Sequence, residues 1–148
     1  MEWGKRVKDT FGQDMGLFDQ RQAFLGVAVC AVSSDGNLEQ KEVLGLNQNV
    51  LRLRMYDGID KKAFDSMLQR IVDYAQKRGL ETLLQASVRA IPDDLKESAF
   101  ALGADLVLSD RRFAAQESDF LERLRGALNV DPDVARKVVE VGAIRHKA

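Results

Sequence analysis

Apolar residues recur at helical spacing through most of this 148-residue chain, and no segment alternates between apolar and polar residues over a useful length. The clearest stretch lies between Asp60 and Gly79. Its apolar residues follow the spacing of one helix face: Phe64, Met67, Leu68, Ile71, Val72 and Ala75. The chain has 2 prolines, so long helices are not interrupted. These patterns predict an all-α fold, a compact bundle of about seven helices joined by short turns.

Local signals place the helices along the chain. Nearly every residue is apolar in the first helix, expected over 18–32, so this helix should be central. A second helix is expected from about residue 39 to 54, ending before Tyr56, and a third from the N-cap Asp60 to the stop signal Gly79. Apolar residues mark a fourth helix over 80–91 and a sixth over 120–128. Pro92 should be the first residue of the fifth helix, and Asp131-Pro132 should cap and begin the seventh.

Composition and charge exclude several classes of protein. With 22 Lys+Arg against 23 Asp+Glu the net charge is −1, so nucleic acid is not expected as a partner. The longest apolar run, 23–32, is about half of the ~20 residues that a membrane span requires, and no leader with a cleavage site precedes it. A cytoplasmic protein is therefore expected. Cys30, the single cysteine, lies inside the apolar run and should be a buried core thiol.

Residues 1–16 differ from the rest and are treated as an N-terminal extension to a helical domain over 17–148. Their amphipathic signal is weak: Trp3, Val7 and Phe11 recur at four-residue spacing, with basic residues between them. A loosely ordered or docked tail is expected, and the alternative is peripheral contact with a membrane surface or a partner.

An internal repeat appears when SDGNLEQKE, from Ser34, is set over SDRRFAAQE, from Ser109. Each unit consists of an apolar helix, an acidic turn, one large apolar residue and a second helix. We therefore expect 23–54 and 95–128 to superpose as two similar helix-turn-helix pairs. Leu38 and Phe113, the large apolar residues after each turn, should be buried, and Gly36 should take a positive φ.

Five acidic residues in and beside these turns are candidate metal ligands: Asp35, Glu42, Asp105, Asp110 and Glu117. Asp35 and Asp110 follow the carboxyl ends of helices, where an exposed negative charge costs roughly 0.3–1 kcal/mol, so a cation beside them would be favourable. Carboxylates without cysteine or internal histidine form an all-oxygen set, which suits Ca²⁺, Mg²⁺ or Mn²⁺. The alternative is that Glu42 and Glu117 cap their helices at position N3 and the aspartates form ion pairs.

These motifs resemble the TerB-like tellurite-resistance proteins, especially their short cyanobacterial type. Asp35, Gly36 and Glu42 match that family's ADG-x-x-x-x-E turn, and DLVLSDRRFAAQE, from Asp105, resembles its second DLVLADG-x-x-x-x-E segment. The resemblance runs from Met15, in MGLFD, to the basic end VVEVGAIRHKA. It implies paired helices, a divalent-metal site on the acidic turns, and a link to tellurite or stress resistance. The second turn departs from the pattern, because Arg111 replaces the glycine.

The function expected from these features is a non-enzymatic TerB-like domain that binds a divalent cation and has a protein partner. The competing hypothesis is a metal-free interaction module whose surface groove binds another protein. An enzyme is not expected, because no nucleophile, base and orienting group are indicated, and His146 lies in the basic end.

Overall fold

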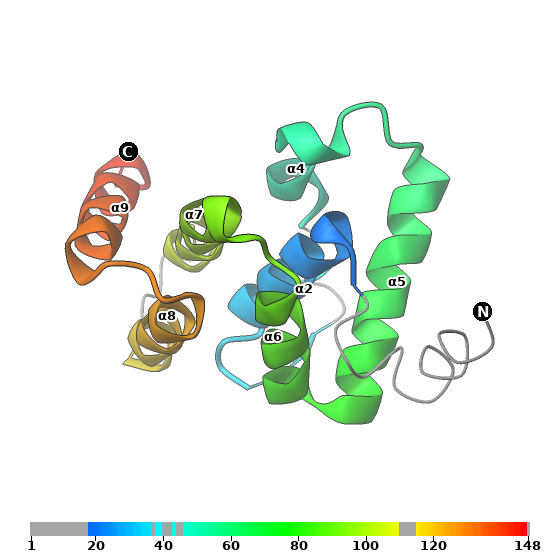
Figure 1. Ribbon diagram of the computed structural model, residues 1–148, viewed down its shortest axis with the longest axis horizontal. Coiled ribbons are helices and arrows are strands. Elements are labelled where there is room, and N and C mark those ends of the chain that lie inside the picture. The colour runs from blue at the N-terminus through cyan, green and yellow to red at the C-terminus, as the bar shows by residue number, and fades with distance from the viewer. Residues whose placement is uncertain (1–17, 37, 40–42, 44–45, 110–114, 148) are drawn as a thin grey trace.

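The computed structural model describes residues 18–36, 38–39, 43, 46–109 and 115–147, and within them the protein is all-α, as expected (Figure 1). The described helices are α2 (Gln20–Val32), α4 (Asn47–Val50), α5 (Lys61–Arg78), α6 (Leu80–Arg89), α7 (Lys96–Leu108), α8 (Ala115–Leu128) and α9 (Pro132–Arg145). Two 3₁₀ turns join them, η1 (Arg54–Tyr56) and η2 (Asp93–Leu95). None of the helices described here is long and apolar enough to cross a membrane.

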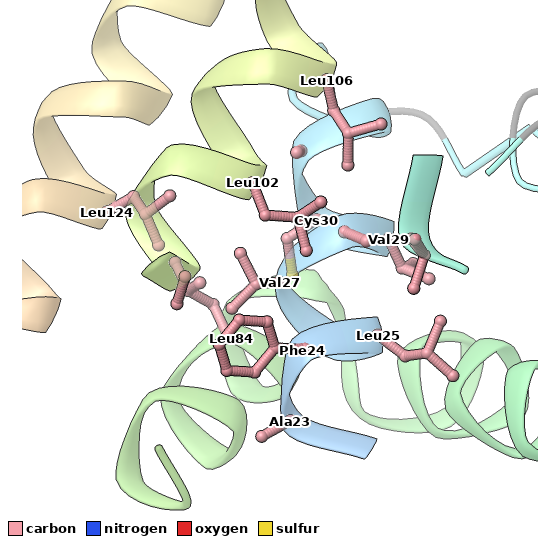
Figure 2. Packing of buried hydrophobic residues seen from close by; sticks show 14 of the residues in the cluster. Ala23, Phe24, Leu25, Val27, Val29, Cys30, Leu84, Leu102, Leu106 and Leu124 are labelled. Carbon is pink, nitrogen blue, oxygen red and sulfur yellow. The ribbon is translucent and has the colours of Figure 1, made fainter. Parts of the chain in front are cut away.

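Helix α2 lies at the centre of the fold, which confirms the expectation from its apolar sequence. Its first turn is closed by a capping box, in which the Asp19 carboxylate accepts from the Gln22 backbone N–H at 2.8 Å. Every residue over 23–31 is buried, because α2 packs against α5, α6 and α7. Figure 2 shows its side chains among those of neighbouring helices, with Leu102 and Leu124 close to Val27.

Helices α5 and α6 form a hairpin beside α2. Gly79 joins them with a φ of 90°, and its N–H donates to the Ala75 carbonyl at 2.7 Å, so the predicted stop signal is confirmed. Helix α6 crosses α2 closely where Gly26 faces Ser87, a buried residue whose hydroxyl donates to the Leu83 carbonyl at 2.8 Å. The small side chains at this crossing allow the two backbones to approach.

Helix α7 connects α2 to the C-terminal helices, since it packs against α2, α8 and α9. Gly103 of α7 lies against Leu124 of α8, and Gly142 of α9 lies against Leu108 of α7. The predicted cap of α9 is confirmed, because the Asp131 carboxylate accepts from the Asp133 N–H at 2.8 Å and Pro132 is the first helical residue.

The second expected helix, 39–54, is wrong in its last part. Helix α4 ends at Val50, Leu51 and Arg52 form a turn, and η1 follows. Tertiary contacts decide this: Tyr56 is buried, its hydroxyl donates to the Arg21 carbonyl, and Arg21 Nε donates to the Met55 carbonyl. Residues 40–42 and 44–45 of the expected helix lie outside the described residues.

The start predicted for the fifth helix is also wrong. Pro92 has an extended ψ of 155° and precedes η2, so α7 begins four positions later, at Lys96. The Pro92 carbonyl accepts from the Leu95 N–H at 3.0 Å, which makes a 3₁₀ turn where the first α-helical turn was expected. Ile91, the residue before Pro92, is buried in the core.

Candidate functional site

The first acidic turn follows the carboxyl end of α2. Gly36 has a φ of 89°, as predicted, and its N–H donates to the Ser33 carbonyl at 2.8 Å, which closes the turn. Asp35 is exposed at the tip, and Ser34 beside it is half-buried. Leu38 is partly buried against the hydrophobic core, so it anchors the segment after the turn less completely than expected.

The second acidic turn follows the carboxyl end of α7. Ser109 ends that helix, with its hydroxyl donating to the Leu106 carbonyl at 2.7 Å and its N–H to the Asp105 carbonyl at 3.0 Å. Glu117 lies in the first turn of α8 and is half-buried. Asp110, Arg111 and Phe113 lie outside the described residues, as does Glu42 of the first unit. The predicted superposition of the two units is wrong at its end, because α4 stops at Val50 whereas α8 continues to Leu128, and it stays a prediction at the turns.

The two turns line one cavity of about 390 Å³. The first unit contributes Ala31, Val32, Ser34, Asp35, Leu46 and Asn49; the second contributes Leu106, Val107, Ser109 and Glu117. The fold thus brings together Asp35 and Glu117, two predicted ligands that come from different halves of the sequence. The lining combines residues with carboxylate, hydroxyl and amide side chains and apolar residues from the ends of α2 and α7.

Asp105 is placed elsewhere by the fold. Its Oδ1 atom lies 2.8 Å from Nε2 of His146, and the two side chains are 31% and 27% exposed. Asp105 also lines a different groove, between α7 and α9, and it does not line the cavity of Asp35 and Glu117. Sequence reasoning missed this contact, since nothing in the spacing of the two residues indicates that α9 returns alongside α7.

The described residues do not form a complete metal centre by themselves. Across residues 18–36, 38–39, 43, 46–109 and 115–147, no group of three or more His, Cys, Asp or Glu residues is placed to hold a metal ion. Two carboxylates with neighbouring hydroxyl and amide oxygens nevertheless have the donor chemistry that hard divalent cations prefer.

Cys30 is a buried thiol of the core, as predicted. Burial raises its pKa to about 12, so the reactive thiolate is not formed at neutral pH. Its Sγ atom lies 3.5 Å from the Leu80 carbonyl oxygen, to which the thiol donates a weak hydrogen bond. The thiol therefore contributes packing rather than nucleophilic chemistry.

Comparison with known proteins gives no match of any of three kinds. No protein-family model matches the chain, no curated protein matches it, and no solved structure matches it.

Proposed function

We propose that this protein is a non-enzymatic, TerB-like domain that binds a hard divalent cation, Ca²⁺, Mg²⁺ or Mn²⁺, in the cavity between its two acidic turns. One observation carries the proposal: Asp35 and Glu117, from the two sequence-related units, line the same cavity. The family resemblance of the sequence extends the proposal to a role in tellurite or stress resistance in the cytoplasm.

The donor set fits a hard cation. Ca²⁺ takes six to eight oxygen ligands from carboxylates, carbonyls, amides and water, whereas zinc favours sulfur and nitrogen. Besides Asp35 and Glu117, the cavity offers oxygen atoms of Ser34, Ser109 and Asn49. The proposed ligand set leaves out Asp105, because its carboxylate contacts His146 outside the cavity.

A cation in this cavity would connect the two halves of the fold. The cavity lies where the carboxyl ends of α2 and α7 meet, and these two helices pack against each other in the core. A cation beside helix C-termini is electrostatically favourable, and it also reduces repulsion between neighbouring carboxylates. Binding should therefore stabilise the folded protein and order the two turns relative to each other.

Thermal melting tests the proposal. After chelation, the full chain is melted with and without each cation in turn, at concentrations well above the expected Kd. A ligand present at 100 times its Kd stabilises the folded state by about 2.7 kcal/mol. For a chain of this length that stabilisation raises the Tm by roughly 5–10 °C. Metal analysis of gently purified protein would identify the cation that is retained.

Matched variants locate the site. Asp35→Asn and Glu117→Gln should each abolish the rise in Tm, whereas Asp105→Asn should keep it, because Asp105 lies outside the cavity. Asp110→Asn should have less effect than Asp35→Asn, since Arg111 supplies a positive charge where the first turn has Gly36. Equal responses from wild type and Asp35→Asn would refute the proposed site. If no cation shifts the Tm, the acids are helix caps and ion pairs, and the interaction-module alternative stands.

A further inference from the structure

A second concave surface lies between α7 and α9, and it shares one lining residue, Asn49, with the cavity of the acidic turns. We call it the α7–α9 groove, and its volume is about 620 Å³. Its lining comes from three segments: residues 49–53, one face of α7 and one face of α9. Figure 1 shows α7 between α9 and α4, and we call the α7 part of the lining the floor and the other two parts the walls.

Three of the five α7 residues that line the floor of the groove have small side chains. Ser98, Ala101 and Ala104 recur every three residues along α7, which places them on neighbouring turns of one helix face. Short side chains on that face make the surface hollow, and they permit the close approach of another helix. Leu53 and Val138 add apolar surface on the two walls.

One exposed large apolar side chain among the described residues, Val141, lines this groove. Among the described residues the large hydrophobic side chains that are exposed are Leu51 (39%), Val141 (64%) and Ile144 (72%). Val141 lines the groove, while Leu51 and Ile144 are the sequence neighbours of the lining residues Arg52 and Arg145. With Leu53, Leu102 and Val138, Val141 gives the groove an apolar surface, and exposed apolar surface in a concavity indicates an interaction site.

The rim of the groove is basic. Arg52 lies on one wall, with Lys137 and Arg145 on the other. The carboxylate among the described lining residues, Asp105, is in contact with His146. An occupant of the groove therefore needs apolar residues along its centre and negative charge along its edges.

We propose that the α7–α9 groove binds an acidic amphipathic helix of a protein partner. The partner's apolar residues, spaced i, i+3, i+4 and i+7, pack on the floor around Ala101 and against Val141. Its Asp and Glu residues flank this stripe and pair with Arg52, Lys137 and Arg145. The residues 1–16 of the protein itself fit less well, because basic residues, Lys5, Arg6 and Lys8, separate their apolar residues.

Selection from a displayed library tests the partner's chemistry. The library consists of helical peptides of about 18 residues, which is five turns at 3.6 residues per turn. The bait is the full-length protein in a buffer with chelator, so that no divalent cation is bound. Peptides enriched on wild type should combine the apolar stripe with Asp and Glu flanks, and their Kd is then measured by fluorescence anisotropy. Enrichment of peptides with basic flanks, or of none, would overturn the proposal.

Surface variants tie the binding to the groove. Val141→Glu and the pair Lys137→Glu with Arg145→Glu should each weaken the selected peptide at least tenfold, a loss of about 1.4 kcal/mol. These residues are exposed, so the variants should keep their Tm. Arg70→Glu, an exposed charge reversal on α5, is the matched control and should bind as wild type. Peptides with Lys in place of Glu should bind the Lys137→Glu and Arg145→Glu double variant more tightly than the selected peptide does. If they do not, the proposed pairing between the peptide's acidic residues and the basic rim is refuted.

Other occupants give different results. Dimerisation that Val141→Glu abolishes would show that a second copy fills the groove, and vesicles of phosphatidylglycerol that bind through Lys137 and Arg145 would show a lipid surface instead. Tighter peptide binding after removal of residues 1–16, with competition by the 1–16 peptide, would assign the groove to that segment. Each of these results overturns the proposal. Unchanged peptide binding by Asp35→Asn separates the groove from the cation site, which stands or falls independently.

Discussion

Replacing Gly26 with alanine should destabilise the protein because α2 and α6 cross without room for a side chain. A Cβ atom built at position 26 would lie 1.9 Å from Ser87 Oγ and 3.0 Å from Ser87 Cβ. Both residues are buried, and Leu83 Cδ1 closes a third side at 3.3 Å. The methyl group therefore forces either the serine rotamer or the helix axes to shift.

The expected magnitude is a balance of two effects. Overpacking a well-packed core costs about 1–3 kcal/mol, and a contact this short belongs near the upper end of that range. Replacing glycine with alanine inside a helix raises the free energy of unfolding by about 1 kcal/mol, because alanine loses less backbone entropy on folding and has a higher helix propensity. The net loss is about 2 kcal/mol in the free energy of unfolding, which lowers the Tm by roughly 4–8 °C.

The assay is thermal and denaturant unfolding of a set of matched variants. Gly126→Ala is the control, because α8 leaves open space around that glycine, so the same substitution should raise stability by up to about 1 kcal/mol. Ser87→Ala alone should change stability by about 1 kcal/mol or less, and combined with Gly26→Ala it should restore part of the loss by removing the Oγ atom. If Gly26→Ala stabilised the protein as Gly126→Ala does, the close crossing of α2 and α6 would be refuted.

Two further predictions follow from buried polar groups. At about pH 8 a thiol reagent should leave Cys30 of the native protein unmodified, because burial raises the pKa of this thiol to about 12. The reagent should label Cys30 once guanidinium unfolds the chain. Rapid labelling of the native protein would contradict the position of Cys30 in the core. Tyr56→Phe should lower the free energy of unfolding by about 1 kcal/mol, because it removes the hydrogen bond to the Arg21 carbonyl that fixes η1 against α2. Denaturant unfolding measures this change. An unchanged free energy of unfolding would show that this hydrogen bond does not stabilise the fold.

Local sequence patterns determined the helices and several of their ends. Helix periodicity and terminal signals depend on residues within a few turns of each other. The sequence therefore predicted both the end of α5 at Gly79 and the N-cap of α9 at Asp131. The uniform apolar sequence of α2 also determined that this helix would be central, because no face of it can remain in water. Gly36 was predicted correctly for the same local reason, since the turn after α2 needs a positive φ.

The candidate site was predicted only in its residue types. The internal repeat indicated Asp35 and Glu117 as candidate ligands. A polar turn between two apolar helices can be recognised from the sequence alone, because it depends only on neighbouring residues. That the two side chains line one cavity depends on how α2 packs against α7, which no local pattern specifies. Asp105 illustrates the limit: its position near the turn favoured the same site, but the return of α9 places it beside His146.

Tertiary structure alone decided the remaining features. Helix α4 ends early because the Tyr56 hydroxyl is hydrogen-bonded to a residue of α2. Helices α2 and α6 cross where Gly26 and Ser87 face each other. The α7–α9 groove likewise exists only where three distant segments meet. Helix propensity and capping act between residues within about four positions of each other, whereas these contacts join residues far apart in the chain. Their energies depend on interatomic distances that are fixed only once the helices have packed.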